Sequence, residues 1–266
     1  MLSISIPPRV ITFLGSIPIT NGVIAAFTTS FILIVFALIV RRNLGIVPSR
    51  LQAAIERMIE YFDDQLTSAF GSRKEARKFL PLIVTLILFI SLANQLSLLP
   101  LLFQITYEGQ PLMRLSTSDL NQTLSLALVV LGLAHVLAFA FSPLKHLGNF
   151  IKIAPLIRAR SLRDVGFAFL DLFMGLLDII GELAKILSLS ARLFGNIFAG
   201  DVMILVIVSL STYTQFFVPL PFLALSIFSG FVQAFVFALL SIQFLSGTIT
   251  SVKGKGHPVP IEGASG

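Results

Sequence analysis

Five ionisable residues share one apolar stretch of the chain, and their types and spacing suit ion-transfer chemistry. The stretch runs from 178 to 201, and its ionisable residues are Asp178, Glu182, Lys185, Arg192 and Asp201. Ionisable groups are costly in hydrocarbon, so those inside a membrane usually mark an ion pathway. Arg192 is the most informative, because a desolvated lysine can lose its proton whereas an arginine stays charged. The stretch therefore keeps a permanent positive charge in a low-dielectric place.

The spacing of these residues predicts two polar zones along a helix. Residues seven apart lie on nearly one side of a helix, and this spacing joins Asp171, Asp178, Lys185 and Arg192. Glu182 and Asn196 follow members of that series by four residues and are its neighbours. Asp201 lies on the opposite face, about 13 Å beyond Arg192 along the helix axis. We therefore expect Arg192 to lie between two separate polar zones.

Such an arrangement can transfer protons to and from a carboxylate. No acid lies within one turn of Arg192 in the sequence, so we infer that a second polypeptide supplies the counter-charge. A carboxylate about 4 Å from an arginine gains about 4 kcal/mol at an effective dielectric of 20. A protonated carboxyl group that arrives from lipid would then release its proton near Arg192 and regain one from the other zone. A structural alternative stays open for Asp178, Glu182 and Lys185, which can satisfy one another as a salt-bridge network.

The composition indicates an integral membrane protein with a single domain over residues 1–266. The chain is 56% hydrophobic and only 12% charged, whereas soluble domains are about a quarter charged. It has no cysteine, which excludes disulfides, thiol catalysis and Cys-based metal sites. The net charge of +6 does not indicate nucleic-acid binding, because the basic residues gather in loops beside apolar runs. The N-terminus lacks a basic region and a clear cleavage site, and we expect it to be retained.

Apolar runs predict an all-α fold with about five membrane-crossing helices. The predicted spans cover about 21–40, 79–103, 119–142, 165–213 and 222–246. The fourth belongs to a proline-free run, 165–218, which as one helix would be about 80 Å long and must be tilted. With one crossing there, the basic loops and the C-terminal tail share one side, and the other side holds only Arg9 and Arg114. The positive-inside rule then places the N-terminus outside and the C-terminus in the cytoplasm.

Two further features of these segments have alternative interpretations. Residues 49–70 repeat apolar side chains on one helical face, and Ser49 with Gln52 fits a capping box. This pattern is typical of an amphipathic helix on the membrane surface, with a helix packed on a partner protein as the alternative. His135 lies deep in the third span, where it could relay protons or hydrogen-bond between helices, and both interpretations stay open.

Several segments resemble subunit a of the F-type ATP synthases. They are SLSARLFGNIFAGD (188–201), FVQAFVFALLSIQFLS (231–246), NQLSLLP (94–100), SDLNQTLSLAL (118–128) and VPSRLQAAIE (47–56). They occur in the family's order and cover most of residues 40–247. The resemblance implies that the last two helices form a long tilted hairpin against a rotating ring of subunit c. It also implies contacts with the subunit b stalk, with other synthase subunits and with lipid, and it implies no cofactor or metal.

The same resemblance assigns roles to individual residues. Arg192 corresponds to the essential arginine that faces the ring carboxylates, and Gln233 to the glutamine beside it on the last helix. The positions associated with ion translocation and the outer half-channel are Asn196, Asp201, Asp119, Asn94, Ser125 and Ser226. Those on the inner side are Asp178, Glu182, Lys185 and Ser188. Three positions differ from many members of the family. Asp201 stands where many have glutamate, Ser226 stands where some have histidine or an acid, and Ser97 stands where aspartate is frequent. The outer proton relay must therefore depend more on Asp201, Asp119 and water.

The function expected from these residues is translocation of H⁺ in a bacterial plasma membrane by a subunit that is not itself an enzyme. No segment resembles a nucleotide-binding loop, so ATP chemistry would belong to partner subunits. A Na⁺-translocating version of the same subunit is one alternative. A stand-alone secondary transporter is another, but it is disfavoured because we find no internal repeat and no broken helix in 165–218. A purely structural anchor would leave Arg192 unexplained.

Overall fold

A computed structural model of the chain describes most of its helices. The described residues are 10–14, 17–97, 106–107, 110–111, 120–150, 162–210 and 218–253. Within these ranges the helices are α1 (Asn21–Arg42), α2 (Arg50–Phe70), α3 (Arg73–Ala76), α4 (Leu80–Ser97), α6 (Leu120–Phe141), α7 (Pro143–Phe150), α9 (Leu162–Leu210) and α10 (Pro219–Lys253). The predicted all-α class is confirmed. The prediction did not include two short antiparallel hairpins, which are β1 (Val10–Leu14) with β2 (Ile17–Thr20) and β3 (Thr106–Tyr107) with β4 (Gln110–Pro111).

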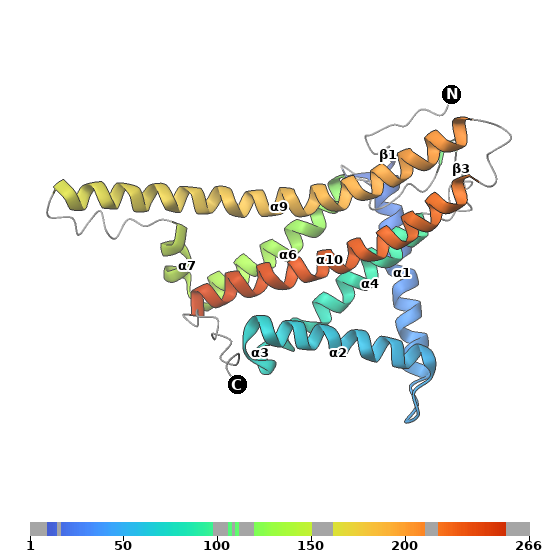
Figure 1. Ribbon diagram of the computed structural model, residues 1–266, viewed down its shortest axis with the longest axis horizontal. Helices are drawn as coiled ribbons and strands as arrows, with labels where there is room; N and C mark the ends of the chain where they lie inside the picture. The colour runs from blue at the N-terminus through green and yellow to red at the C-terminus, as the bar shows by residue number, and fades with distance from the viewer. Residues whose placement is uncertain are drawn as a thin grey trace, which may run out of the picture.

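The apolar helices match the expectation for a membrane bundle. Among the described residues, α1, α6 and α10 are long and apolar enough to cross a membrane, and α4 is a shorter apolar helix. In Figure 1 these helices lie obliquely beside one another, and α9 lies along one side of the group. The common core is formed by buried side chains of α2, α4, α6, α9 and α10, among them Ile90, Val130, Leu193 and Phe237. The number of crossings and the side on which each terminus lies stay predictions.

α9 is one uninterrupted helix of 49 residues, as the proline-free run predicted. At 1.5 Å per residue it is about 74 Å long. Its later part packs against α6 and α10, and α10 runs antiparallel to it (Figure 1). Its earlier part extends beyond the rest of the molecule (Figure 1), and exposed apolar side chains along this part include Phe169, Leu170 and Phe173. This long helix holds Arg192, Asn196 and the predicted inner residues Asp178, Glu182, Lys185 and Ser188 at different heights along one axis.

α2 is amphipathic, but its apolar face is covered in part by the chain itself. Phe62, Leu66 and Phe70 are buried and belong to the common core, and α2 contacts α4 and α10. The Ser49 hydroxyl caps the helix by accepting a hydrogen bond from the Gln52 backbone N–H at 3.3 Å. The reciprocal half of the predicted capping box is absent from these contacts, because the Gln52 side chain bonds the backbone of Gly45 and the Glu56 carboxylate instead.

Candidate functional site

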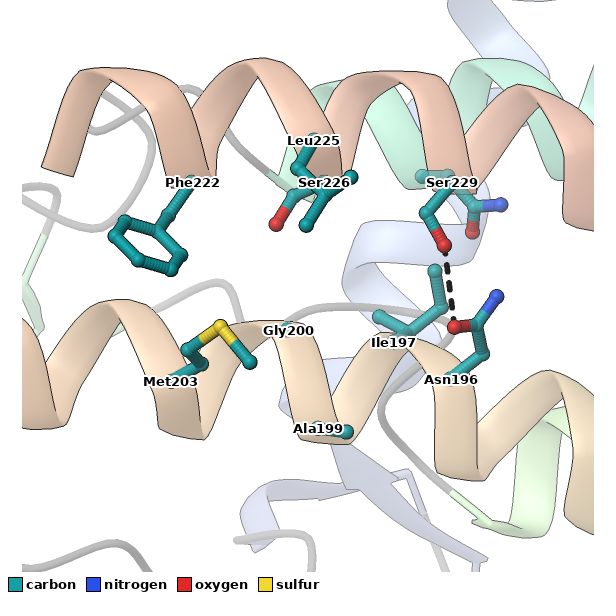
Figure 2. Close-up of a pocket in the computed structure, with 10 residues that line it drawn as sticks. Asn196, Ile197, Ala199, Gly200, Met203, Phe222, Leu225, Ser226 and Ser229 are labelled. Atoms are coloured by element: carbon teal, nitrogen blue, oxygen red, sulfur yellow. Dashed lines mark hydrogen bonds between the residues drawn. The ribbon is translucent and has the colours of Figure 1, made fainter.

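A cavity of about 150 Å³ lies between α9 and α10 at the level of Asn196 and Gly200 (Figure 2). Its polar lining comes from three helices, with Asn94 on α4, Asn196 on α9, and Ser226 and Ser229 on α10. Apolar residues complete the wall, including Ile197, Met203, Phe222 and Leu225. Gly200 keeps the cavity open, because a Cβ atom at this position would lie 3.2 Å from the Ser226 hydroxyl. The structure thus brings Asn94, Asn196 and Ser226 of the predicted outer half-channel to one place.

Hydrogen bonds continue from this cavity towards Gln233. The Ser229 hydroxyl donates to Asn196 Oδ1 at 3.1 Å, and Asn196 Nδ2 donates to Gln233 Oε1 at 3.4 Å. Ser229 and Gln233 are four residues apart on α10, so both face the same turn of α9. The Gln233 side chain is buried, and its Nε2 has no hydrogen-bond partner among the described residues. A buried amide donor without a partner carries an energetic cost.

Arg192 is exposed on α9, one turn before Asn196. Within the part of the chain that the structure describes, it has no ion pair and no side-chain hydrogen bond. Ser188 and Ala199, one turn before it and two turns after it on the same side of α9, are also exposed, so the charge lies on a surface of small side chains. An arginine on such a surface of a membrane helix needs a counter-charge that desolvates with it.

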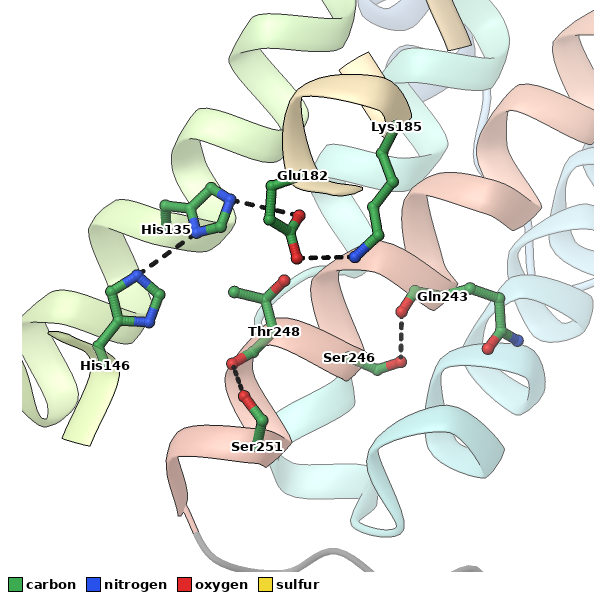
Figure 3. Close-up of polar contacts among 8 residues, drawn as sticks. All are labelled: His135, His146, Glu182, Lys185, Gln243, Ser246, Thr248 and Ser251. Atoms are coloured by element: carbon green, nitrogen blue, oxygen red, sulfur yellow. Dashed lines mark hydrogen bonds and ion pairs between the residues drawn. The ribbon is translucent and has the colours of Figure 1, made fainter. Parts of the chain in front are cut away.

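A second polar cluster lies on the other side of Arg192 along α9 (Figure 3). Lys185 Nζ donates to Glu182 Oε1 at 2.7 Å, and His135 Nε2 of α6 lies 3.5 Å from Glu182 Oε2. His135 Nδ1 lies 3.4 Å from His146 Nε2 of α7. Lys185 Nζ also lies 5.7 Å from the ring centre of Phe244 on α10. We call His135, His146, Glu182 and Lys185 the histidine cluster.

His146 is a member of this cluster that the sequence reasoning missed. It is buried in α7, outside the predicted spans, while its neighbours Leu144 and Leu147 are exposed. Burial lowers the pKa of His146 below its ordinary value, His135 acts in the same direction, and Glu182 opposes both. The available signal was the position of His146 just after Pro143, where a turn after the third span can bring its ring back to His135.

The remaining predicted residues have different positions. The Ser125 hydroxyl donates to the Asn121 carbonyl at 2.7 Å and lines a separate cavity of about 520 Å³ beside α1, so it does not join the α9–α10 cavity. Asp178 and Ser188 are exposed on α9. Asp201 lies in α9, but its side chain is outside the described part, as is the whole of Asp119. No group of three described His, Asp or Glu residues is arranged to hold a metal ion.

The buried contact between α6 and α9 includes a polar pair that was not predicted. The hydroxyls of Thr123 and Ser190 lie 3.1 Å apart, and both side chains are buried. This hydrogen bond fixes α9 against α6 between the cavity and the histidine cluster. Along α9 the order is the histidine cluster, Arg192 and then the cavity, with about 10 Å of axial rise from Lys185 to Arg192 and about 12 Å from Arg192 to Gly200. The predicted arrangement of two polar zones around Arg192 is consistent with this order.

Comparison with known proteins identifies similar chains over most of the length. A family model described as "ATP synthase A chain" matches residues 23–246. "ATP synthase subunit a" of Desulfosudis oleivorans is 31% identical over 231 residues, which are 85% of this chain and 87% of the relative. "ATP synthase subunit a 2" of a Bradyrhizobium species is 32% identical over 241 residues, covering 90% and 93%. "ATP synthase subunit a" of Moorella thermoacetica is 30% identical over 243 residues, covering 91% and 96%.

Proposed function

Because the chain belongs to the ATP synthase A chain family, we propose that it is the proton-translocating stator subunit of an F-type ATP synthase. In this role it conducts protons through two offset half-channels and has no bond chemistry of its own. Its partners are a ring of subunit c that carries one carboxylate per subunit, the subunit b stalk and the other synthase subunits. The membrane is a bacterial plasma membrane, with the N-terminus outside and the C-terminus in the cytoplasm.

The observation that carries this proposal is the state of Arg192. Its guanidinium is exposed between two polar zones and has no acidic partner among the described residues. A permanent charge on a membrane helix is stabilised when an opposite charge approaches it with good geometry. A ring carboxylate that arrives from lipid supplies that charge, provided that it first releases its proton. Arg192 therefore favours deprotonation of the ring carboxyl and then holds the carboxylate.

The two polar zones supply and remove the proton. On the outer side, Asn94, Asn196 and Ser226 line the cavity, and Asp119, Ser125 and Asp201 complete the outer group. On the inner side the group is Asp178, Glu182, Lys185 and Ser188. Gln233 accepts a hydrogen bond from Asn196 and would steady the carboxylate beside Arg192 once its buried amide nitrogen turns outward. Arg192 between the zones also repels a cation that would cross directly, so proton flow requires movement of the ring.

The test is ATP-driven and passive proton flux in inverted membrane vesicles that contain the intact complex, with Arg192→Ala compared with the wild type. We expect ATP-driven pumping to be abolished while the complex stays assembled, and a passive leak to appear if Arg192 is also the barrier between the half-channels. Arg57→Ala is the matched control, because Arg57 is an exposed arginine on α2, and it should pump normally. Unchanged pumping in Arg192→Ala would overturn the proposal. Flux that requires Na⁺ and survives a protonophore would assign Na⁺ as the ion instead.

A further inference from the structure

We propose that His146 and His135 form a proton relay that connects the surface around α7 with Glu182, as a branch of the inner half-channel (Figure 3). The proposal rests on the function proposed above and extends it to two residues outside the assigned inner group. It concerns three helices, because His135 lies on α6, His146 on α7 and Glu182 on α9.

The polar atoms of these residues follow one another as an open chain. His146 Nε2 is 3.4 Å from His135 Nδ1, and the other nitrogen of His135 is 3.5 Å from Glu182 Oε2. The second oxygen of Glu182 is 2.7 Å from Lys185 Nζ. His135 therefore uses both ring nitrogens, one towards each neighbour. This is the geometry that an imidazole needs to accept a proton on one side and release another on the other side.

The charges around the chain of atoms favour transfer. Lys185 Nζ lies 2.7 Å from Glu182 Oε1, and a positive charge beside a carboxylate favours its ionised form. His146 is neutral near pH 7 because its burial disfavours the imidazolium form. A neutral imidazole has one donor and one acceptor nitrogen, as a relay member requires. α10 contributes the Phe244 ring beside Lys185, and Lys145, next to His146 on α7, is exposed.

During ATP-driven pumping, protons enter this branch from the cytoplasmic side. The proton enters at His146 Nδ1, which is buried in this structure, so a local opening of α7 must bring water to it. As Nδ1 takes this proton from hydronium, the Nε2–H bond of His146 breaks and a new N–H bond forms at His135 Nδ1. The Nε2–H bond of His135 then breaks as an O–H bond forms at Glu182 Oε2. Glu182 passes its proton towards the ring carboxylate. Both imidazoles regain their starting orientation of donor and acceptor nitrogens by rotation of the ring, which moves no net proton. One proton moves in each step, and no electron is transferred.

The polar link between α6 and α9 does not depend on the histidines alone. The contacts of His135 with His146 and Glu182 are 3.4 and 3.5 Å long, whereas hydrogen bonds are typically 2.7–3.2 Å. The tight polar link between α6 and α9 is the 3.1 Å bond between Thr123 and Ser190, which holds the two helices without His135.

The experiment compares His135→Gln and His146→Gln in inverted vesicles that contain the intact complex. Proton uptake driven by ATP is measured as the compensating release of K⁺ through valinomycin, a readout that neutral imidazole does not disturb. Each assay is run with and without added imidazole, and with MES as a buffer that lacks the ring. His257→Gln, at the third histidine of the chain, is the matched control. Complex content is measured by immunoblot in each preparation.

We expect both variants to pump about three- to tenfold more slowly than the wild type. This slowing is smaller than that for the loss of a directly acting acid or base, because water can replace part of a relay. Imidazole, but not MES, should restore most of the lost rate relative to the wild type under the same conditions. Normal pumping in both variants, or a loss that imidazole does not restore, would overturn the relay. Arg192→Ala in the same assay separates the two proposals. If Arg192→Ala abolishes pumping while the histidine variants pump normally, only the relay is contradicted. If the Arg192→Ala variant also pumps normally, the proposed function is contradicted as well.

Discussion

Asn94 joins α4 to α10 at Gly230 by a hydrogen bond and by close packing at the same point. Its Nδ2 donates to the Gly230 carbonyl at 2.9 Å, and the Asn94 side chain is buried. A Cβ atom at position 230 would lie 3.1 Å from Asn94 Cβ and 3.4 Å from Gln95 Nε2. The absence of a side chain at Gly230 therefore allows α10 to approach α4 closely enough for the hydrogen bond. Small residues have this role at many helix contacts in membranes.

Gly230→Ala should destabilise the protein, because the added methyl group must push α10 away from Asn94. Overpacking at a close contact costs about 1–3 kcal/mol, which exceeds the helix propensity gained by alanine. Thermal unfolding of the full chain in detergent micelles, followed by circular dichroism at 222 nm, measures the change. Gly247→Ala is the control on the same helix, since a Cβ there meets nothing within 4 Å. If both variants melt alike, Gly230 is not a required close contact.

Much of the helical fold follows from patterns along the sequence. The α1 and α6 helices begin and end within about two residues of the predicted spans. A long apolar run between charged or polar ends crosses a membrane as a helix, because only a helix satisfies its backbone hydrogen bonds there. The long α9 followed from the lack of proline in 165–218. The burial of Phe62 and Leu66 of α2 against the chain's own core was not predicted, because an amphipathic pattern gives the apolar face but not what covers it.

The candidate site was predictable where its residues share one helix, and less so where it joins several. The order of Glu182, Arg192 and Asn196 follows from helical periodicity alone. The Ser229–Asn196 bond and the place of His146 depend on how α10 and α7 pack on α9 and α6, which periodicity does not fix. The role of Ser125 in the outer group stays a prediction, and the structure places this residue in a second cavity.

Gly200→Ala should slow proton pumping, because its methyl group would narrow the cavity between α9 and α10. The new Cβ would lie 3.2 Å from the Ser226 hydroxyl, so one of the two must shift by a few tenths of an ångström. Since a misplacement of about 1 Å can cost about 100-fold, a shift of this size should slow pumping by about two- to tenfold. The measurement is ATP-driven pumping in inverted vesicles that contain the intact complex.

Two controls test the cause of that effect. Gly132→Ala lies on α6 and its Cβ would meet nothing within 4 Å, so it should pump as the wild type does. Adding Ser226→Ala to Gly200→Ala removes the close contact and should restore part of the rate, with Ser226→Ala alone as its reference. A double variant as slow as Gly200→Ala would show that crowding against Ser226 is not the cause.

Asp63→Asn should destabilise the corner between α2 and α3. Asp63 is buried and accepts hydrogen bonds from Arg73 Nε and Nη2 at 3.0 and 2.8 Å, with Arg77 Nε at 3.6 Å. The hydrogen bond and the charge of Asp63 raise the pKa of Arg73 above its ordinary value. An asparagine has nearly the size of an aspartate but lacks the negative charge that pairs with the two arginines. We expect a melting temperature lower by a few degrees in micelles, and no measurable change for the exposed neighbour in Asp64→Asn. Equal melting temperatures for Asp63→Asn and wild type would contradict this role.

His146 should make the stability of the folded chain sensitive to mild acid. Its pKa in the folded chain is lowered from the ordinary 6.5, chiefly by burial. Below about pH 6.5, His146 therefore binds a proton more readily in the unfolded chain than in the folded chain. The contribution of neutral His146 to the free energy of unfolding is therefore fully present above about pH 6.5, and it decreases as the pH falls towards the lowered pKa. Between about pH 7.5 and 5.5, the melting temperature of the wild type in micelles should therefore fall more than that of His146→Gln. Other groups titrate equally in both chains, so the difference isolates His146. Parallel decreases in the two proteins would mean that the imidazole is protonated as readily in the folded chain as in the unfolded one.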